Sequence, residues 1–141
     1  MSARIRPVVQ FVAEHRIVEL LAAGLTAIAY GLGFVFITSA AAIAATPSFR
    51  YTVMLAPLPV WAAGFITLAT AAAALLTRSR RAAQPALAAL ALVFGTFGVS
   101  IIWSLPAGGI PTGFVAYVGL GYLALVTSVA CSVPRTPGRR R

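Results

Sequence analysis

The side chains with acid–base chemistry gather near the start of the chain. Glu14 and Glu19 are the only acidic residues and His15 is the only histidine, and His15 and Glu19 stand four residues apart, a spacing that brings side chains together on a helix. This pattern indicates a candidate site for handling a proton or an ion. The alternative interpretation, which we favour, is a hydrated interfacial helix whose charges pair with one another and with Arg16.

The rest of the sequence offers little catalytic or metal-binding chemistry. A single cysteine, Cys131, excludes an intramolecular disulfide and a cysteine-based metal site. No phosphate-binding loop or dinucleotide-binding motif occurs. We therefore predict that the chain is not an enzyme and has no catalytic residue, metal or cofactor.

Composition shows which solvent surrounds these residues. Of 141 residues, 60% are hydrophobic and only 9% are charged, and the mean hydropathy is +0.95. Soluble domains carry about 25% charged residues, and a domain of this size cannot hide so much apolar surface from water. The composition predicts a protein of the lipid bilayer.

Four apolar segments are long enough to cross a bilayer as helices, and lipid leaves helices as the only structure open to such runs. We predict an all-α, polytopic membrane protein whose four transmembrane helices form a compact bundle. The expected organisation is a basic tail and interfacial helix over residues 1–16, a transmembrane domain over 17–132 and a basic tail over 133–141. The four spans are expected at about 17–45, 58–77, 85–104 and 112–132.

Arginine placement predicts the orientation. Every basic residue is an arginine, and all but Arg50 lie in the two tails or in the turn between the second and third spans. Positive residues favour the cytoplasmic side, so we expect both termini in the cytoplasm and the protein in a bacterial inner membrane. The same clustering beside spans argues against nucleic-acid binding, despite a sequence pI near 11.6. Arginines expected to contact anionic lipid headgroups are Arg78, Arg80, Arg81, Arg139, Arg140 and Arg141.

Small residues recur at helical spacing in three of the spans. They let helices approach closely and gain packing contacts in lipid. We favour packing within the bundle, and self-association is the alternative. The residues expected to pack helices are Ala23, Ala27, Gly31, Ala91, Gly95, Gly119 and Gly121.

The layout resembles that of the small four-span membrane proteins of actinobacteria and their phages. The resemblance is carried by a basic N-terminal tail, the entry to the second span at Pro57, Pro59 and Trp61, an arginine-rich middle turn and a basic C-terminus. Some of those phage proteins are regarded as holin-like. The resemblance implies a protein that accumulates in the inner membrane, oligomerises and opens lesions.

Three functional hypotheses follow from these observations. The first is an oligomerising, holin-like or membrane-disrupting protein held by anionic lipids. The second is a non-catalytic accessory or assembly subunit that docks on another membrane protein. The third is a small channel or transporter that uses Glu19, since a carboxylate inside the hydrocarbon is functional by default. That hypothesis requires the first helix to start as early as Pro7.

Overall fold

The structure is a bundle built only from helices in the part of the chain that it describes. This computed structural model describes residues 17–105 and 111–133. The helices are α2 (Ile17–Thr38), α3 (Ala40–Ala44), α4 (Arg50–Leu55), α5 (Leu58–Arg78), α6 (Arg80–Ser104) and α7 (Pro111–Ser132), with a 3₁₀ turn, η1 (Pro47–Phe49), before α4. Helices α2, α5 and α6, and the stretch Gly113–Ser132 of α7, are long and apolar enough to cross a membrane. The all-α class and the four candidate spans are therefore confirmed.

Two helix boundaries differ from the sequence prediction. The first span was expected to continue to residue 45, but α2 ends at Thr38 because Ser39 leaves helical geometry (φ −119°, ψ 22°) before the short α3 begins. The third span was expected to begin at Pro85, but α6 begins at Arg80. There the Ser79 side chain accepts a hydrogen bond of 3.1 Å from the Ala82 amide, a favourable N-terminal cap. The sequence prediction placed the start of this span by its apolar residues and therefore missed the polar first turn of α6.

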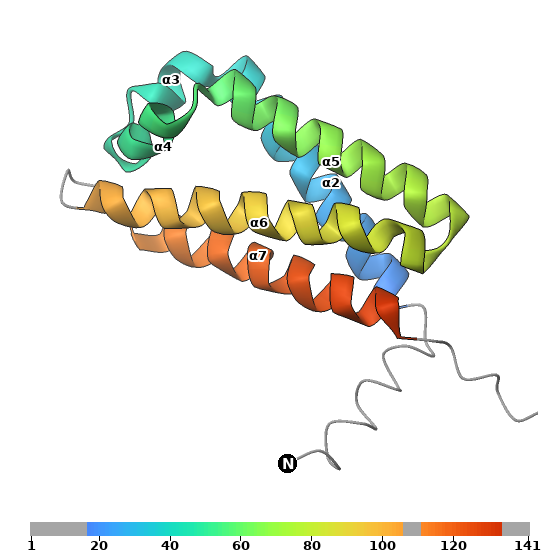
Figure 1. Ribbon diagram of the computed structural model, residues 1–141. Coiled ribbons are helices and arrows are strands. Elements are labelled where there is room, and N and C mark those ends of the chain that lie inside the picture. The colour runs from blue at the N-terminus through green and yellow to red at the C-terminus, as the bar shows by residue number, and fades with distance from the viewer. Residues whose placement is uncertain (1–16, 106–110, 134–141) are drawn as a thin grey trace, which may run out of the picture.

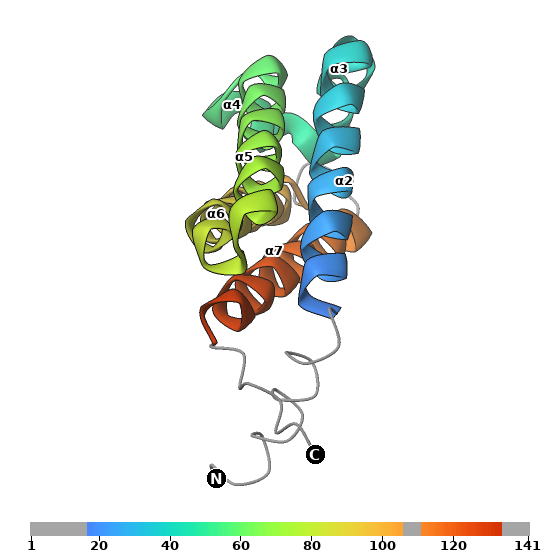
Figure 2. The same ribbon diagram turned by 90° about the vertical axis from the view of Figure 1, so that its right-hand side faces the viewer.

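The four long helices form two layers. Helix α2 lies beside α5 and α6 lies beside α7, and α5 packs on α6 across the layers (Figure 2). Helices α5 and α6 meet at a tight turn and diverge away from it, with α3 and α4 beyond the far end of α5 (Figure 1). We call the end that holds the α5–α6 turn, the start of α2 and the end of α7 the turn end. The opposite end, closed by η1 and α4, is the cap end.

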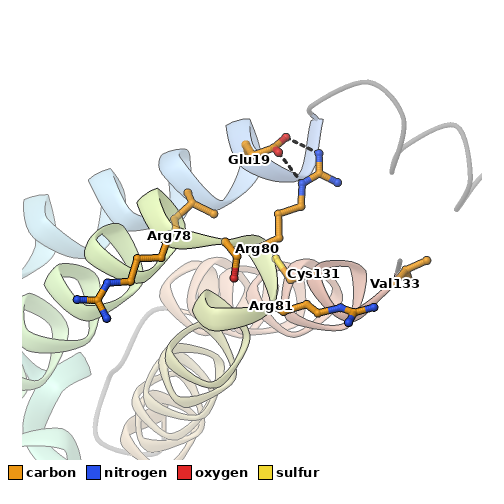
Figure 3. A pocket seen from close by; sticks show the side chains of 8 residues that line it. Glu19, Arg78, Arg80, Arg81, Cys131 and Val133 are labelled. Atoms are coloured by element: carbon orange, nitrogen blue, oxygen red, sulfur yellow. Dashed lines mark hydrogen bonds and ion pairs between the residues drawn. The ribbon is translucent and has the colours of Figure 1, made fainter. Parts of the chain in front are cut away.

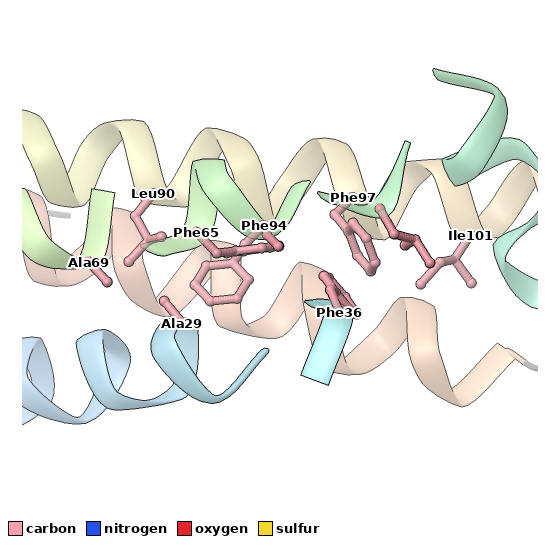
Figure 4. Close-up of a cluster of buried hydrophobic side chains, with 10 residues drawn as sticks. Ala29, Phe36, Phe65, Ala69, Leu90, Phe94, Phe97 and Ile101 are labelled. Carbon is pink, nitrogen blue, oxygen red and sulfur yellow. The ribbon is translucent and has the colours of Figure 1, made fainter. Parts of the chain in front are cut away.

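Aromatic side chains fill the space between the layers. Phe36, Phe65, Phe94 and Phe97 are almost completely buried, and their rings lie close together in the core (Figure 4). Ring centroids are 5.1 Å apart for Phe36 and Phe97 and 5.0 Å apart for Phe65 and Phe94. Tyr117 of α7 meets Phe97 edge-on at 4.6 Å. Such pairs contribute about 0.5–1.5 kcal/mol each beyond their buried area.

Hydroxyl groups hold the cap end together. Thr52 of α4 and Ser100 of α6 are both buried, and their hydroxyl oxygens lie 2.5 Å apart. The Tyr51 amide donates to the Ser104 hydroxyl at 3.3 Å, and the Trp61 indole donates to the Thr52 carbonyl at 3.1 Å. These bonds give α4 polar partners on both α6 and α5, so a polar segment can close an otherwise apolar bundle.

Glycines bring α6 and α7 into backbone contact. A Cβ added to Gly121 would lie 3.1 Å from the Gly95 amide nitrogen and 3.2 Å from the Ala91 carbonyl oxygen. A Cβ added to Gly98 would lie 2.8 Å from Val118 Cγ2 and 3.0 Å from its nitrogen. Close approach of this kind increases dispersion contacts between helices in lipid. The expected packing role of Ala91, Gly95 and Gly121 is therefore seen within the bundle.

Candidate functional site

The ionisable residues of the turn end meet in one ion pair. Glu19 lies in the first turn of α2, and Arg80 begins α6. The Arg80 Nε and Nη2 atoms donate to the two Glu19 carboxylate oxygens, each at 2.5 Å. The side chain of Arg80 is 11% exposed and that of Glu19 is 30% exposed. Two parallel bonds between planar groups fix both side chains in orientation, so the pair ties α2 to α6.

An apolar cluster lies next to this ion pair. Val18, Ala83, Leu87 and Cys131 are buried together there, drawn from α2, α6 and α7. The cluster excludes water from one side of the pair, which strengthens the attraction between its charges. The ion pair joins α2 to α6, and the apolar cluster beside it brings in α7 through Cys131.

A pocket of about 540 Å³ opens beside the pair. Its lining includes Glu19, the three arginines of the α5–α6 turn, Cys131 and Val133. Arg80 reaches across to Glu19, whereas Arg78 and Arg81 extend away from the pair in different directions (Figure 3). Both Arg78 and Arg81 are exposed. The pocket thus combines basic side chains with an apolar wall.

The predicted acid–base cluster is placed only in part. Glu14 and His15 lie outside the described residues, so the expected His15–Glu19 contact is not tested. Glu19 itself is paired with Arg80, which follows it by 61 positions. Sequence spacing along one helix could not reveal that partner. The only usable signal was that the few carboxylates and the arginine turn were both expected at the same membrane surface.

The expected headgroup arginines separate into two kinds. Arg78 and Arg81 are exposed as a headgroup contact requires, whereas Arg80 is largely buried and makes the internal ion pair. The interhelical role of Arg80 was not predicted from the sequence. Arg139, Arg140 and Arg141 lie outside the described residues.

The three small residues of α2 that were expected to pack helices do not pack inside the bundle. Ala23, Ala27 and Gly31 are all exposed and face away from the core, and a Cβ added to Gly31 would meet nothing within 4 Å. Gly119 of α7 is also exposed and equally uncrowded. For these four residues the favoured prediction of packing within the bundle is wrong. Helices α2 and α7 turn their opposite faces toward the core, where Leu25, Phe36 and Ala124 are buried.

The outer side of α5 continues this pattern. After Val60, which is 58% exposed, the exposed positions of its outer line are alanines and threonines as far as Thr77. The Thr70 hydroxyl lies 2.6 Å from the Tyr30 hydroxyl of α2, which places the outer sides of the two helices next to each other. We call the combined surface the small-residue face. Its members are Ala23, Ala27, Gly31, Ala63, Thr67, Thr70, Ala74 and Thr77, all of them exposed.

The other layer presents large side chains outward. Leu92 and Trp103 of α6 are 73% and 58% exposed, and Tyr122 and Val129 of α7 are 70% and 57% exposed. Large apolar side chains of this kind are readily solvated by lipid chains. Large side chains are exposed on the α2–α5 layer as well, where Leu20, Phe34 and Val60 are 70%, 66% and 58% exposed.

Most hydroxyls within the spans are satisfied locally. Thr70 and Thr127 bond to carbonyls of their own helices, and Ser128 donates across to the Gln84 carbonyl at 3.0 Å. Among the described residues, no buried side-chain nitrogen or oxygen lacks a hydrogen-bond partner, and no group of three potential metal ligands occurs. Comparison with protein-family models, with curated proteins and with solved structures finds no match to this chain.

Proposed function

We propose that this chain is a multi-pass protein of a bacterial cytoplasmic membrane, with both termini in the cytoplasm, that self-associates through its small-residue face. The orientation is supported by the arginine bias, because Arg78 and Arg81 extend from the turn end while Arg50 is the basic residue of the cap end. The turn end then faces the cytoplasm.

The observation that carries self-association is the run of small side chains along the outer sides of α2 and α5. All of its members are exposed, and Thr70 is the member that bonds to the neighbouring helix, through the Tyr30 hydroxyl. In a bilayer, helices associate through close packing and interhelical hydrogen bonds, since lipid tails are as apolar as leucine. The small-residue face is suited to both.

A second copy of the same chain is the partner we propose for this face. The stripe of α2 is flanked by Leu20 and Phe34, which are 70% and 66% exposed. These bulky residues lie at the two ends of the stripe, and the small residues between them allow a second helix to approach closely. Threonines of α5 add hydroxyl groups that can bond across an interface.

The activity we propose for the assembly is permeabilisation of the membrane, as the resemblance to holin-like proteins implies. Association through α2 and α5 would bring the threonine-bearing sides of several copies together. An accessory subunit would use the same face to bind a different membrane protein. A transporter that depends on Glu19 is disfavoured by the ion pair with Arg80, which commits that carboxylate to a structural contact.

The experiment measures self-association and membrane potential for matched glycine variants. Gly31→Leu fills the small-residue face, and Gly119→Leu makes the same change on the outer side of α7. An added Cβ meets nothing within 4 Å at either position, so neither replacement places its first carbon against a neighbouring helix. We expect Gly31→Leu to reduce cross-linked oligomers and to abolish depolarisation on induced expression, and Gly119→Leu to retain both.

Three results would decide between the functions. Equal oligomer loss in both variants, or in neither, would refute association through the small-residue face. Oligomers without depolarisation would remove the membrane-disrupting activity. Wild-type protein that stays monomeric and harmless, but co-purifies with another membrane protein unless Gly31 is replaced, would establish the accessory function.

A further inference from the structure

The turn-end pocket has the charge of an anion site. Three arginines and one glutamate line it, and the glutamate is already paired with Arg80. The excess positive charge comes from Arg78 and Arg81, which line the pocket and extend from the α5–α6 turn in different directions (Figure 3). A ligand there must carry negative charge, and guanidinium groups recognise phosphate particularly well.

The pocket also has an apolar wall. Leu76 of α5 and Cys131 and Val133 at the end of α7 line it together with the arginines. A free inorganic anion gains nothing from such a wall, whereas a glycerol backbone and the first methylenes of an acyl chain do. The lining therefore matches an amphiphilic ligand better than a small ion.

The position of the pocket in the bundle points to the same ligand. It lies where α2 begins and where α5 and α7 end, at the limit of three candidate spans. If these helices cross the bilayer, the pocket lies at the level of the phosphates on the side where anionic lipids attract basic residues. Its volume of about 540 Å³ lies within the range of about 300–1,000 Å³ usual for small-molecule sites.

We propose that the turn-end pocket binds the phosphate diester of one anionic phospholipid, and that the exposed side chains of Arg78 and Arg81 turn toward the pocket to become its cationic contacts. The Glu19–Arg80 pair positions the α6 start against α2 and so shapes the wall between them. The acyl chains leave the pocket past Leu76, which precedes Arg78 within the α5 span, toward the hydrocarbon. This site requires membrane insertion but not self-association, so it stands or falls independently of the small-residue face.

The test titrates the full-length protein in neutral detergent with phosphatidylglycerol or phosphatidylcholine and counts bound lipids by native mass spectrometry. Variants Arg78→Gln and Arg81→Gln each remove one contact at an exposed position. Arg50→Gln removes the same charge at the cap end and serves as the matched control. Thermal unfolding of each variant verifies that it is folded.

We expect wild type and Arg50→Gln to retain one phosphatidylglycerol in preference to phosphatidylcholine. Each pocket variant should weaken that binding about tenfold, the usual effect of losing a hydrogen bond to a charged group. Equal loss in Arg50→Gln, no loss in either pocket variant, or equal binding of the two lipids would overturn the proposal. Displacement of the lipid by millimolar glycerol 3-phosphate would also overturn it, because the ligand would then be a soluble phosphate ester.

Discussion

The contact between α6 and α7 allows a sharp test of the packing argument. Replacing Gly121 by alanine adds one methyl group, whose carbon would lie 3.1 Å from the Gly95 nitrogen and 3.2 Å from the Ala91 oxygen. Those atoms belong to the backbone and cannot rotate aside. The helices must therefore separate by a few tenths of an ångström, and every contact along their interface weakens.

The magnitude follows from comparison with Gly119→Ala, a change two residues away on the same helix. At Gly119 the added methyl meets nothing within 4 Å. Both variants gain the same helix propensity, about 0.5–1 kcal/mol in favour of alanine, so this contribution cancels between them. Only Gly121→Ala carries the cost of overpacking, about 1–3 kcal/mol. We expect Gly121→Ala to be less stable than Gly119→Ala by that amount.

The assay is reversible unfolding of the purified protein in mixed micelles, with sodium dodecyl sulfate as denaturant and helix content followed by circular dichroism. The same comparison can be made within α6, where Gly98 is crowded by Val118 and Gly95 is uncrowded on its Cβ side. If Gly121→Ala is as stable as Gly119→Ala, the close α6–α7 approach does not exist in solution and the reasoning fails.

Three further predictions concern the two ends of the bundle. Glu19→Gln should lower the free energy of unfolding by about 1–3 kcal/mol, because it leaves the largely buried Arg80 guanidinium without its carboxylate. The same micelle titration measures this change, and an unchanged stability would mean that the ion pair is not formed. Thr52→Val should lower the free energy of unfolding by about 1 kcal/mol in that titration, since Ser100 keeps its bond to the Phe97 carbonyl. A loss above about 3 kcal/mol would mean that more than this one hydrogen bond depends on Thr52. In a Cys131→Ser background, single cysteines in place of Ser79 and Thr46, both exposed, should react with a membrane-impermeant thiol reagent from the cytoplasmic and outer sides respectively. The reverse pattern would overturn the proposed orientation.

The four candidate spans could be predicted because each depends on local composition. A stretch such as residues 58–77 has no polar residue that could stop a helix in lipid, and Pro57 and Pro59 fit at its start. The predicted end of the second span lies within one residue of the observed α5. The ends of α2 and α6 were missed because they depend on backbone geometry at Ser39 and on a side-chain cap at Ser79.

The sequence alone determined that the chain forms helices, that four of them are long and apolar enough to cross a membrane, and where its charge lies, since these follow from residue type and order. Only the tertiary structure decided which face of each helix is buried. Ala23 and Ala91 occupy similar small-residue patterns, yet Ala91 is buried against α7 and Ala23 is exposed. The partner of Glu19 was decided in the same way. Contacts between residues far apart in the chain depend on how whole helices pack. A small side chain allows close approach of another helix but does not determine which helix that is.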